Sequence, residues 1–205
     1  MKNKIEIVEQ TKLAFDFLQK LYLETTYLIK EIEGVLSEEN EKFIIGKPAG
    51  YGITSRSSTG LEANSVQLWL LRRFAVFFVE EDKTVLKGGQ TNTNLSPKLK
   101  VLYLRVVLDG AKLKKPVIYS GLLYKIEKKP IAKWTKFEYV MGYIEYKDNK
   151  LFAEPEKINY EDSYLKMKGK LITNNLYDIN NSEDIRRLII DPSLKIYRSI
   201  VLQSG

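Results

Sequence analysis

The hydrophobic pattern of the first third of the chain is helical. Over residues 4–36, apolar side chains recur at steps of three and four, and charged residues flank the stripe that they form. This spacing predicts a long amphipathic helix over residues 4–36, ended by Gly34 and the polar run SEENEK. The stripe passes through Leu18, Leu21, Leu28, Ile32 and Val35, with Thr11, Ala14 and Thr25 at its remaining positions.

Two interpretations of this helix stay open. It can lie across one face of a sheet and bury its stripe there. Alternatively, it can be a self-association surface, because its steps of three and four sum to sevens, as in a coiled-coil seam. We expect the first interpretation; the argument for the second is length, since about 30 residues make a helix longer than most small sheets are wide.

The rest of the chain has mainly strand character. Short breaks separate several apolar segments, which favours hairpins and an antiparallel sheet, because parallel strands need long crossovers. Segment 86–98, with Gly88-Gly89 and a cluster of Asn, Thr and Ser, is predicted to be a loop. Segment 163–174 alternates apolar residues with lysine, which is typical of an exposed or edge strand. The other predicted strands lie within 66–82, 100–110, 116–127 and 136–149.

The C-terminal region predicts a short helix over residues 179–190. Asn181 or Ser182 is its expected N-cap, and Asp191-Pro192 is expected to end it. Residues 194–203 follow as a strand or a helix. The predicted fold is α+β: a long N-terminal amphipathic helix on a mainly antiparallel sheet of about five to seven strands, with a short helix near the C-terminus. The helix (1–40) and the sheet domain (41–205) are expected to form one unit.

Composition excludes several chemistries. The chain has no cysteine and no histidine, so disulfides, cysteine-held metal centres and histidine-based catalysis are impossible. A metal would have to be a hard ion on oxygen ligands, and we expect no cofactor. No apolar run reaches the roughly 18 residues of a membrane span, and the start MKNKIEIVEQ lacks the apolar core of a secretory signal. We therefore expect a cytoplasmic protein with no membrane contact.

Positive charge is concentrated in one segment. Residues 112–136 carry eight lysines and one acid, Glu127, an excess that equals the net charge of +7 of the whole chain. Lysines bind phosphates and aromatic rings stack on unpaired bases, so this segment predicts a nucleic-acid surface. Alternatively, lysines in turns and on edges keep a sheet soluble. The predicted contact residues are Lys112, Lys114, Lys115, Lys128, Lys129, Lys133, Trp134 and Lys136.

The stretch GKPAGYGITSRSSTG (46–60) predicts a second anion contact. It matches neither the P-loop nor the G-x-G-x-x-G pattern. Its glycines free backbone N–H groups, while hydroxyls and two basic residues add donors and charge. A mobile loop is the alternative interpretation. The predicted phosphate contacts are Lys47, Ser55, Arg56, Ser57 and Ser58.

A catalytic alternative rests on three residues at strand ends. Asp109, Glu127 and Lys129 resemble the PD-(D/E)xK nuclease pattern, although the preceding proline of that family is absent. The resemblance implies two acids that hold magnesium and a lysine that activates the attacking water. Without it, the sequence predicts no catalytic residue and no metal.

Two non-catalytic functions follow from these patterns. The first is a nucleic-acid-binding protein, an accessory subunit or a dimer, with DNA and RNA equally open. The second is a structural or protein-interaction subunit that associates, as a homodimer or within a complex, through residues 4–36.

Overall fold

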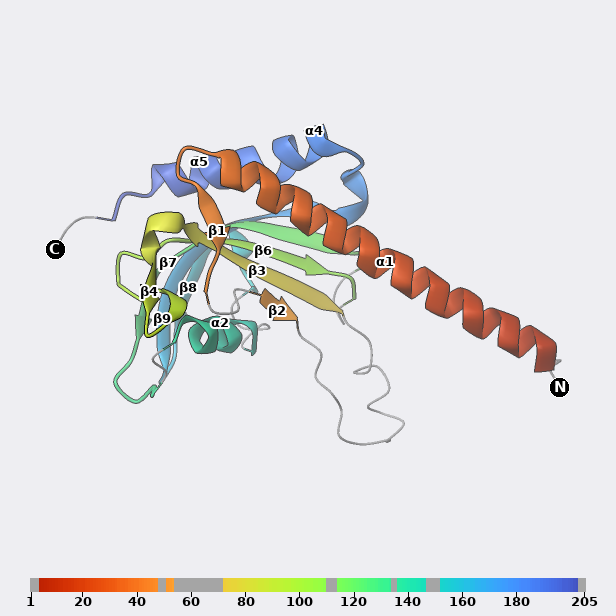
Figure 1. Ribbon diagram of the computed structural model, residues 1–205, viewed down its shortest axis with the longest axis horizontal. Helices are drawn as coiled ribbons and strands as arrows, with labels where there is room; N and C mark the ends of the chain where they lie inside the picture. Colours follow the sequence, from red (N-terminus) through yellow and green to blue (C-terminus); the bar gives the residue numbers. More distant parts are fainter. Residues whose placement is uncertain are drawn as a thin grey trace.

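The computed structural model describes residues 4–47, 51–53, 72–109, 114–133, 136–146 and 152–202. It confirms the predicted α+β class and the long N-terminal helix, α1, which spans Lys4–Glu38. The helix runs past Gly34, so this glycine does not end it. Figure 1 shows α1 crossing the sheet with its C-terminal end and extending well beyond the sheet with its N-terminal end.

An antiparallel sheet forms the body of the molecule. Within the described residues it has seven strands, in the order β1-β3-β6-β7-β9-β8, with β2 beside β1 along the same edge of β3. The bounds are β1 Phe43–Ile45, β2 Tyr51–Ile53, β3 Arg73–Glu80, β6 Val101–Val107, β7 Val117–Lys128, β8 Ile158–Glu161 and β9 Leu165–Asn175. Four of the predicted segments, 66–82, 100–110, 116–127 and 163–174, therefore contain strands as predicted.

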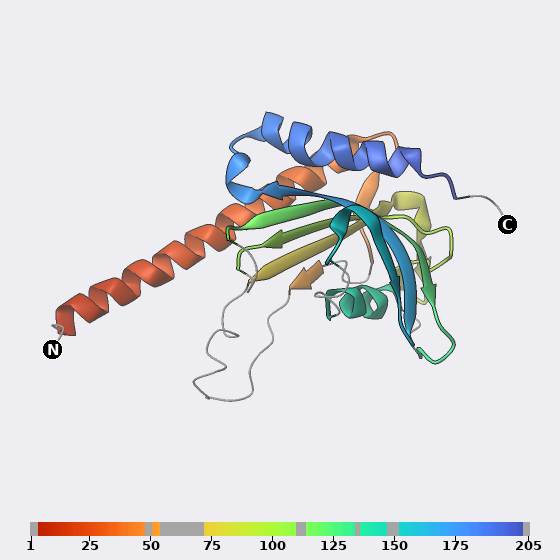
Figure 2. The ribbon, with the colours of Figure 1, turned by 180° about the vertical axis from the view of Figure 1, so that it is seen from behind.

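Each face of the sheet packs against helices. One face, with Phe78, Leu104 and Ile118, meets the C-terminal part of α1 and the C-terminal helices. The opposite face, with Phe77 and Leu123, meets α2 (Phe137–Tyr146). Figure 2 shows these two layers from behind, with α2 on the side of the sheet away from α1 and from α5 (Asp191–Ser199).

The prediction of a strand within 136–149 is wrong, because most of this segment is the helix α2. Its buried apolar residues are Phe137, Val140, Met141 and Ile144, which recur at helical spacing and form one face. The aromatic and apolar residues at 137, 139, 141 and 143 also alternate in the sequence. That alternation imitates a strand, and the burial of one helical face decides the outcome.

One loop prediction and the edge position of one predicted strand also need correction. Segment 86–98 is not a simple loop, because β4 (Thr84–Lys87) and β5 (Gln90–Thr93) form a hairpin within and beside it. Gly88 and Gly89 both have positive φ, as a two-residue hairpin turn requires. Segment 163–174 is exposed on one face, but β9 lies between β7 and β8 rather than at the edge.

The C-terminal helix also continues past its predicted end. Asn181 caps α4 (Ser182–Ile185) as predicted, and a π-helical turn (Arg186–Ile190) leads into α5 (Asp191–Ser199). Pro192 cannot donate to the carbonyl of Leu188 four residues earlier. The side-chain amide of Asn174 donates to that carbonyl at 2.8 Å, so the proline is tolerated.

Candidate functional site

The most unusual surface of the molecule is the N-terminal part of α1. We define residues 4–20 as the projecting half of α1 and residues 21–38 as its packed half. All side chains from Glu6 to Phe17 are exposed, whereas Thr25, Ile29, Ile32 and Leu36 of the packed half are buried. The helix meets the sheet at Tyr22, whose ring lies 5.8 Å from that of Phe74.

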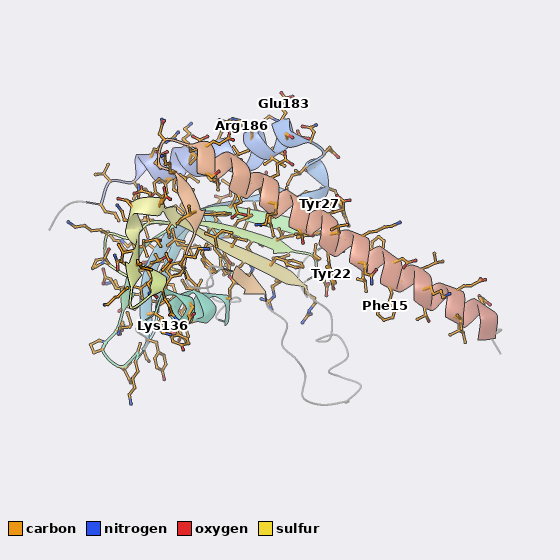
Figure 3. The ribbon with its side chains drawn as sticks, in the orientation of Figure 1. Phe15, Tyr22, Tyr27, Lys136, Glu183 and Arg186 are labelled. Carbon is orange, nitrogen blue, oxygen red and sulfur yellow. The ribbon has the colours of Figure 1, made fainter. Side chains whose placement is uncertain are left out.

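Large apolar side chains cover the projecting half. Between 49% and 68% of their surface is exposed, far more than a soluble surface helix usually shows over one stretch. Figure 3 shows Phe15 beyond Tyr22, on the part of α1 that has left the sheet. The residues are Ile7, Val8, Leu13, Phe15 and Phe17.

A groove of about 390 Å³ lies where the projecting half joins the body. Leu21, Thr25 and Leu28 of α1 form one wall, and the connection from β9 to α4 forms the other. Tyr27 and Tyr177 stand at opposite walls and are each about 60% exposed, at 58% and 62%. The apolar surface of α1 therefore continues into a concave site.

The lysine segment is divided between the two ends of β7. Lys114 and Lys115 are exposed just before this strand, and Lys128 and Lys129 lie at its far end. Twelve residues of strand separate them by about 40 Å. Lys133 and Lys136 are exposed near the start of α2, at the far end, whereas Lys112 and Trp134 lie outside the described residues. The structure thus brings together only part of the predicted contact face.

A row of lysines that the sequence prediction missed lies beside the end of β7 that carries Lys128 and Lys129. Lys166, Lys168 and Lys170 alternate with buried Leu165, Met167 and Leu171 on β9, so they share the face opposite α2. Lys168 pairs in register with Tyr124 of β7. The alternation of lysine with apolar residues in 163–174 was the signal that could have identified this row.

Ion pairs connect the row to the lysine segment. One oxygen of Glu161 accepts a hydrogen bond from Lys129 at 2.7 Å, and the other lies 3.7 Å from Lys166. Residues 124–129 and 158–170 together carry six lysines and three acids. The far end of the β7–β9 pair is therefore basic.

The glycine-rich stretch is described only at its beginning and in β2. Gly46 lies so close to α2 that a Cβ there would be 2.3 Å from a ring carbon of Phe137. Lys47 follows Gly46 and Lys136 precedes Phe137 in the sequence. These two lysines therefore flank one contact. Ser55, Arg56, Ser57 and Ser58 lie outside the described residues.

The three nuclease-like residues do not come together. Asp109 follows β6 at the end where Val107 pairs with Val117, and it lies 3.6 Å from Arg72. Glu127 is ten residues further along β7, about 33 Å away. Lys129 pairs with Glu161 instead. Among the described residues no group of three or more acidic side chains could hold a metal ion.

A buried ion pair fastens α2 to the sheet. Arg105 of β6 and Glu145 of α2 are 1% and 5% exposed, with 3.9 Å between Nε and Oε2. The Tyr103 hydroxyl donates to Glu145, and the Arg105 guanidinium lies 4.5 Å from the ring centroid of Phe152. Burial raises the pKa of Tyr103 well above its ordinary value, so its hydroxyl stays a donor. This arrangement is structural, because removing either charge would strand the other in the interior.

A carboxylate at the β8–β9 turn provides a second attachment. The hydroxyls of Tyr143 of α2 and Tyr160 of β8 both donate to Asp162, as do the backbone N–H groups of Tyr164 and Leu165. Burial opposes ionisation, but these four donors outweigh it and lower the pKa of Asp162. The carboxylate therefore holds α2, β8 and the turn together in its charged form.

Comparison of the chain with protein families, with curated proteins and with solved structures finds no match. None of the helices in the described residues has the length and apolar character of a membrane span. The function therefore has to follow from the geometry of the chain itself.

Proposed function

We propose that this protein is an assembly subunit that docks onto another protein chain through the projecting half of α1. One observation carries the proposal: a helical stretch of about 17 residues presents five large apolar side chains to solvent. An isolated helix of that length is marginal in water, so packing against a partner would also stabilise the helix itself.

The charge on this stretch favours a protein over a lipid surface. Helices that lie on membranes carry an excess of Lys or Arg on their polar face. Over residues 4–20 the chain has three acids and three lysines, a net charge of zero. An anionic bilayer would therefore gain no net electrostatic attraction from this helix.

The proposal predicts that Phe15→Glu leaves the folded monomer intact and removes assembly. Because Phe15 is 62% exposed, the free energy of unfolding measured in dilute protein should change by less than about 0.5 kcal/mol. In extract of cells that make the protein, the wild type should sediment as a species larger than a monomer, and the variant as a monomer.

Leu86→Glu is the matched control, because Leu86 is 75% exposed on β4, away from α1. It should affect neither stability nor assembly. If Phe15→Glu lowered the free energy of unfolding by several kcal/mol, the face would belong to the fold, and docking through it would be wrong.

We infer a second candidate function, contact with single-stranded nucleic acid, from the β9 lysine row. Lys166, Lys168 and Lys170 are spaced about 7 Å apart along one strand, and the partly buried Tyr124 lies beside Lys168, where its exposed edge could contact a base. This surface supports the interpretation better than the lysine segment, whose two ends lie about 40 Å apart.

Fluorescence anisotropy with labelled single-stranded RNA and DNA at low salt tests this function. Replacing all three lysines of the row by Gln should weaken binding and reduce the slope of log affinity against log salt by about 2. Lys114→Gln with Lys115→Gln, at the other end of β7, is the control and should change little. No binding at micromolar protein, or an equal loss in the control, would exclude the row as a contact site.

A further inference from the structure

We propose that the chain docked on the projecting half of α1 is a second copy of this protein, with the two helices antiparallel. This inference rests on the proposed docking function and specifies its partner. Its starting point is the heptad pattern, in which Ile7, Thr11, Ala14 and Leu18 occupy consecutive seam positions at steps of four, three and four.

Between Ile7 and Leu18 the seam and its flanks carry no charge, and the charged seam residue Lys4 lies at the start of the helix. Val8, Gln10, Phe15 and Phe17 occupy the positions on either side of the seam. Every charged residue from Glu6 to Lys20 lies on the outer positions: Glu6, Glu9, Lys12, Asp16 and Lys20. A partner rich in charge would lose hydration against this face without gaining an ion pair, whereas an identical uncharged face fits it.

Antiparallel pairing gives consistent layers. With the two-fold axis between residues 12 and 13, Ile7 faces Leu18 of the second copy, and Thr11 faces Ala14 of the second copy. The small residues at the centre let the helices approach closely, and the large ones close both ends. On the flanks, Val8 comes beside Phe15 of the second copy, and Gln10 beside its Phe17. Four of the five exposed apolar residues are thereby covered, and Leu13 stays outside.

The packed half of α1 excludes the parallel arrangement. The same stripe continues through Thr25 and Ile32, which the rest of the same chain already buries. A parallel partner helix following the seam would run into the body of that chain after Leu21. An antiparallel partner does not, because Lys4, where its helix begins, lies opposite Leu21. The groove begins at this point, so the start of the partner helix arrives at its mouth.

The contact is short, which sets the expected affinity. Residues 4–21 of each helix overlap over about 26 Å, a small interface that corresponds to a weak or transient complex. Dimerisation should therefore depend on concentration, and sedimentation from about 1 μM to about 200 μM should show the weight-average mass rising from one chain towards two.

Two adjacent substitutions locate the interface. Ala14→Glu places a charge at the centre of the seam and should keep the protein monomeric at every concentration. Leu13→Glu introduces the same side chain one residue away, on the outer face, and should dimerise like the wild type. Equal behaviour of the two variants would overturn the seam, and a wild type that stays monomeric at about 200 μM would overturn self-pairing.

Cysteine cross-linking tests the orientation without background, because the chain has no cysteine. When the Thr11→Cys and Ala14→Cys variants are mixed and oxidised, the antiparallel pair predicts mainly cross-links between residue 11 of one copy and residue 14 of the other. Cross-links mainly between two residues 14 would indicate parallel helices and contradict the proposal.

The two levels of inference fail separately. One outcome refutes self-pairing alone: the purified wild type stays monomeric at every concentration, while Phe15→Glu keeps the free energy of unfolding and removes assembly in cell extract. In that case the protein docks onto a different chain through the same face. If Phe15→Glu unfolds the monomer, docking through this face is itself wrong.

Discussion

The projecting and packed halves of α1 share one hydrophobic pattern but lie in different surroundings. The stripe keeps its steps of three and four from Ile7 to Val35. Ile32 in the packed half is 1% exposed, whereas Ile7 in the projecting half is 49% exposed. The same side chain at equivalent positions is therefore core in one half and surface in the other.

This difference shows what a hydrophobic stripe can and cannot indicate. The stripe specifies which face of the helix seeks an apolar environment. It does not specify whether the same chain provides that environment. The sheet reaches α1 only from Tyr22 onward, so the face before it is left for another chain under our proposal.

The largest expected effect comes from the same substitution in each half. Ile32→Ala should lower the free energy of unfolding by about 2–5 kcal/mol, because it leaves a cavity in a packed core. Ile7→Ala should change it by less than about 0.5 kcal/mol. Denaturant titrations of dilute protein measure both. A comparable loss in the two variants would mean that the projecting half is part of the core.

The sequence predicted the elements whose pattern is unambiguous. The helix over 4–36 and the strands within 100–110 and 116–127 had both the period and the length of their classes. Segment 136–149 could not be resolved, because its apolar residues fit period 2 and period 3.6 equally well. Only packing against Phe77 and its neighbours selects the helical face.

The candidate sites were less predictable, because they depend on which strands are neighbours. Charge density singled out 112–136, but a strand with lysines at both ends cannot gather them on one surface. The pairing of β7 with β9 places Lys168 beside Tyr124, and no local pattern reports that pairing. The interpretation that α1 lies on one face of the sheet is confirmed for its packed half, whereas self-association through the helix stays a prediction.

Ion pairs at the end of the packed half give the next effect. Arg198 of α5 donates to Glu41 with two nitrogens at 2.7 Å each, and to Glu39 at 3.1 Å. The side chain of Arg198 is 47% exposed, so solvent screens these pairs. Arg198→Ala should lower the free energy of unfolding by about 1 kcal/mol, the upper end for exposed ion pairs. Arg187→Ala, which leaves α1 untouched, should lower it by less.

These pairs also give the packed half a pH dependence. The hydrogen bond from Arg198 lowers the pKa of Glu41 below its ordinary value. A lowered carboxyl pKa contributes stability that is complete above the unfolded pKa of about 4.3 and is lost as pH falls through the folded pKa. Unfolding titrations below pH 5 should therefore show a shallower acid loss in Arg198→Ala than in the wild type. Identical acid profiles would remove Glu41 from this role.

A smaller effect of opposite sign is expected at Gly34. This glycine lies inside α1, and a Cβ there would meet nothing within 4 Å. Gly34→Ala should raise the free energy of unfolding by about 0.5–1 kcal/mol, because alanine restricts the unfolded chain and favours helix. Thermal unfolding of dilute protein measures the gain. A loss would show that the helix near residue 34 needs the freedom of glycine.

The reverse substitution, from alanine to glycine at position 14 of the projecting half, should change the global free energy of unfolding least. Ala14→Gly weakens the helix locally by about 1 kcal/mol, but residues 4–20 contribute little to the cooperative core. The global free energy of unfolding should stay within about 0.5 kcal/mol of the wild type, while amide hydrogen exchange over residues 4–20 accelerates about fivefold. At high concentration the wild type should protect these amides more than the variant does, because self-pairing stabilises the helix. If Ala14→Gly lowered the global stability as much as Gly34→Ala raises it, the two halves would unfold as one unit, and the contrast between them would be wrong.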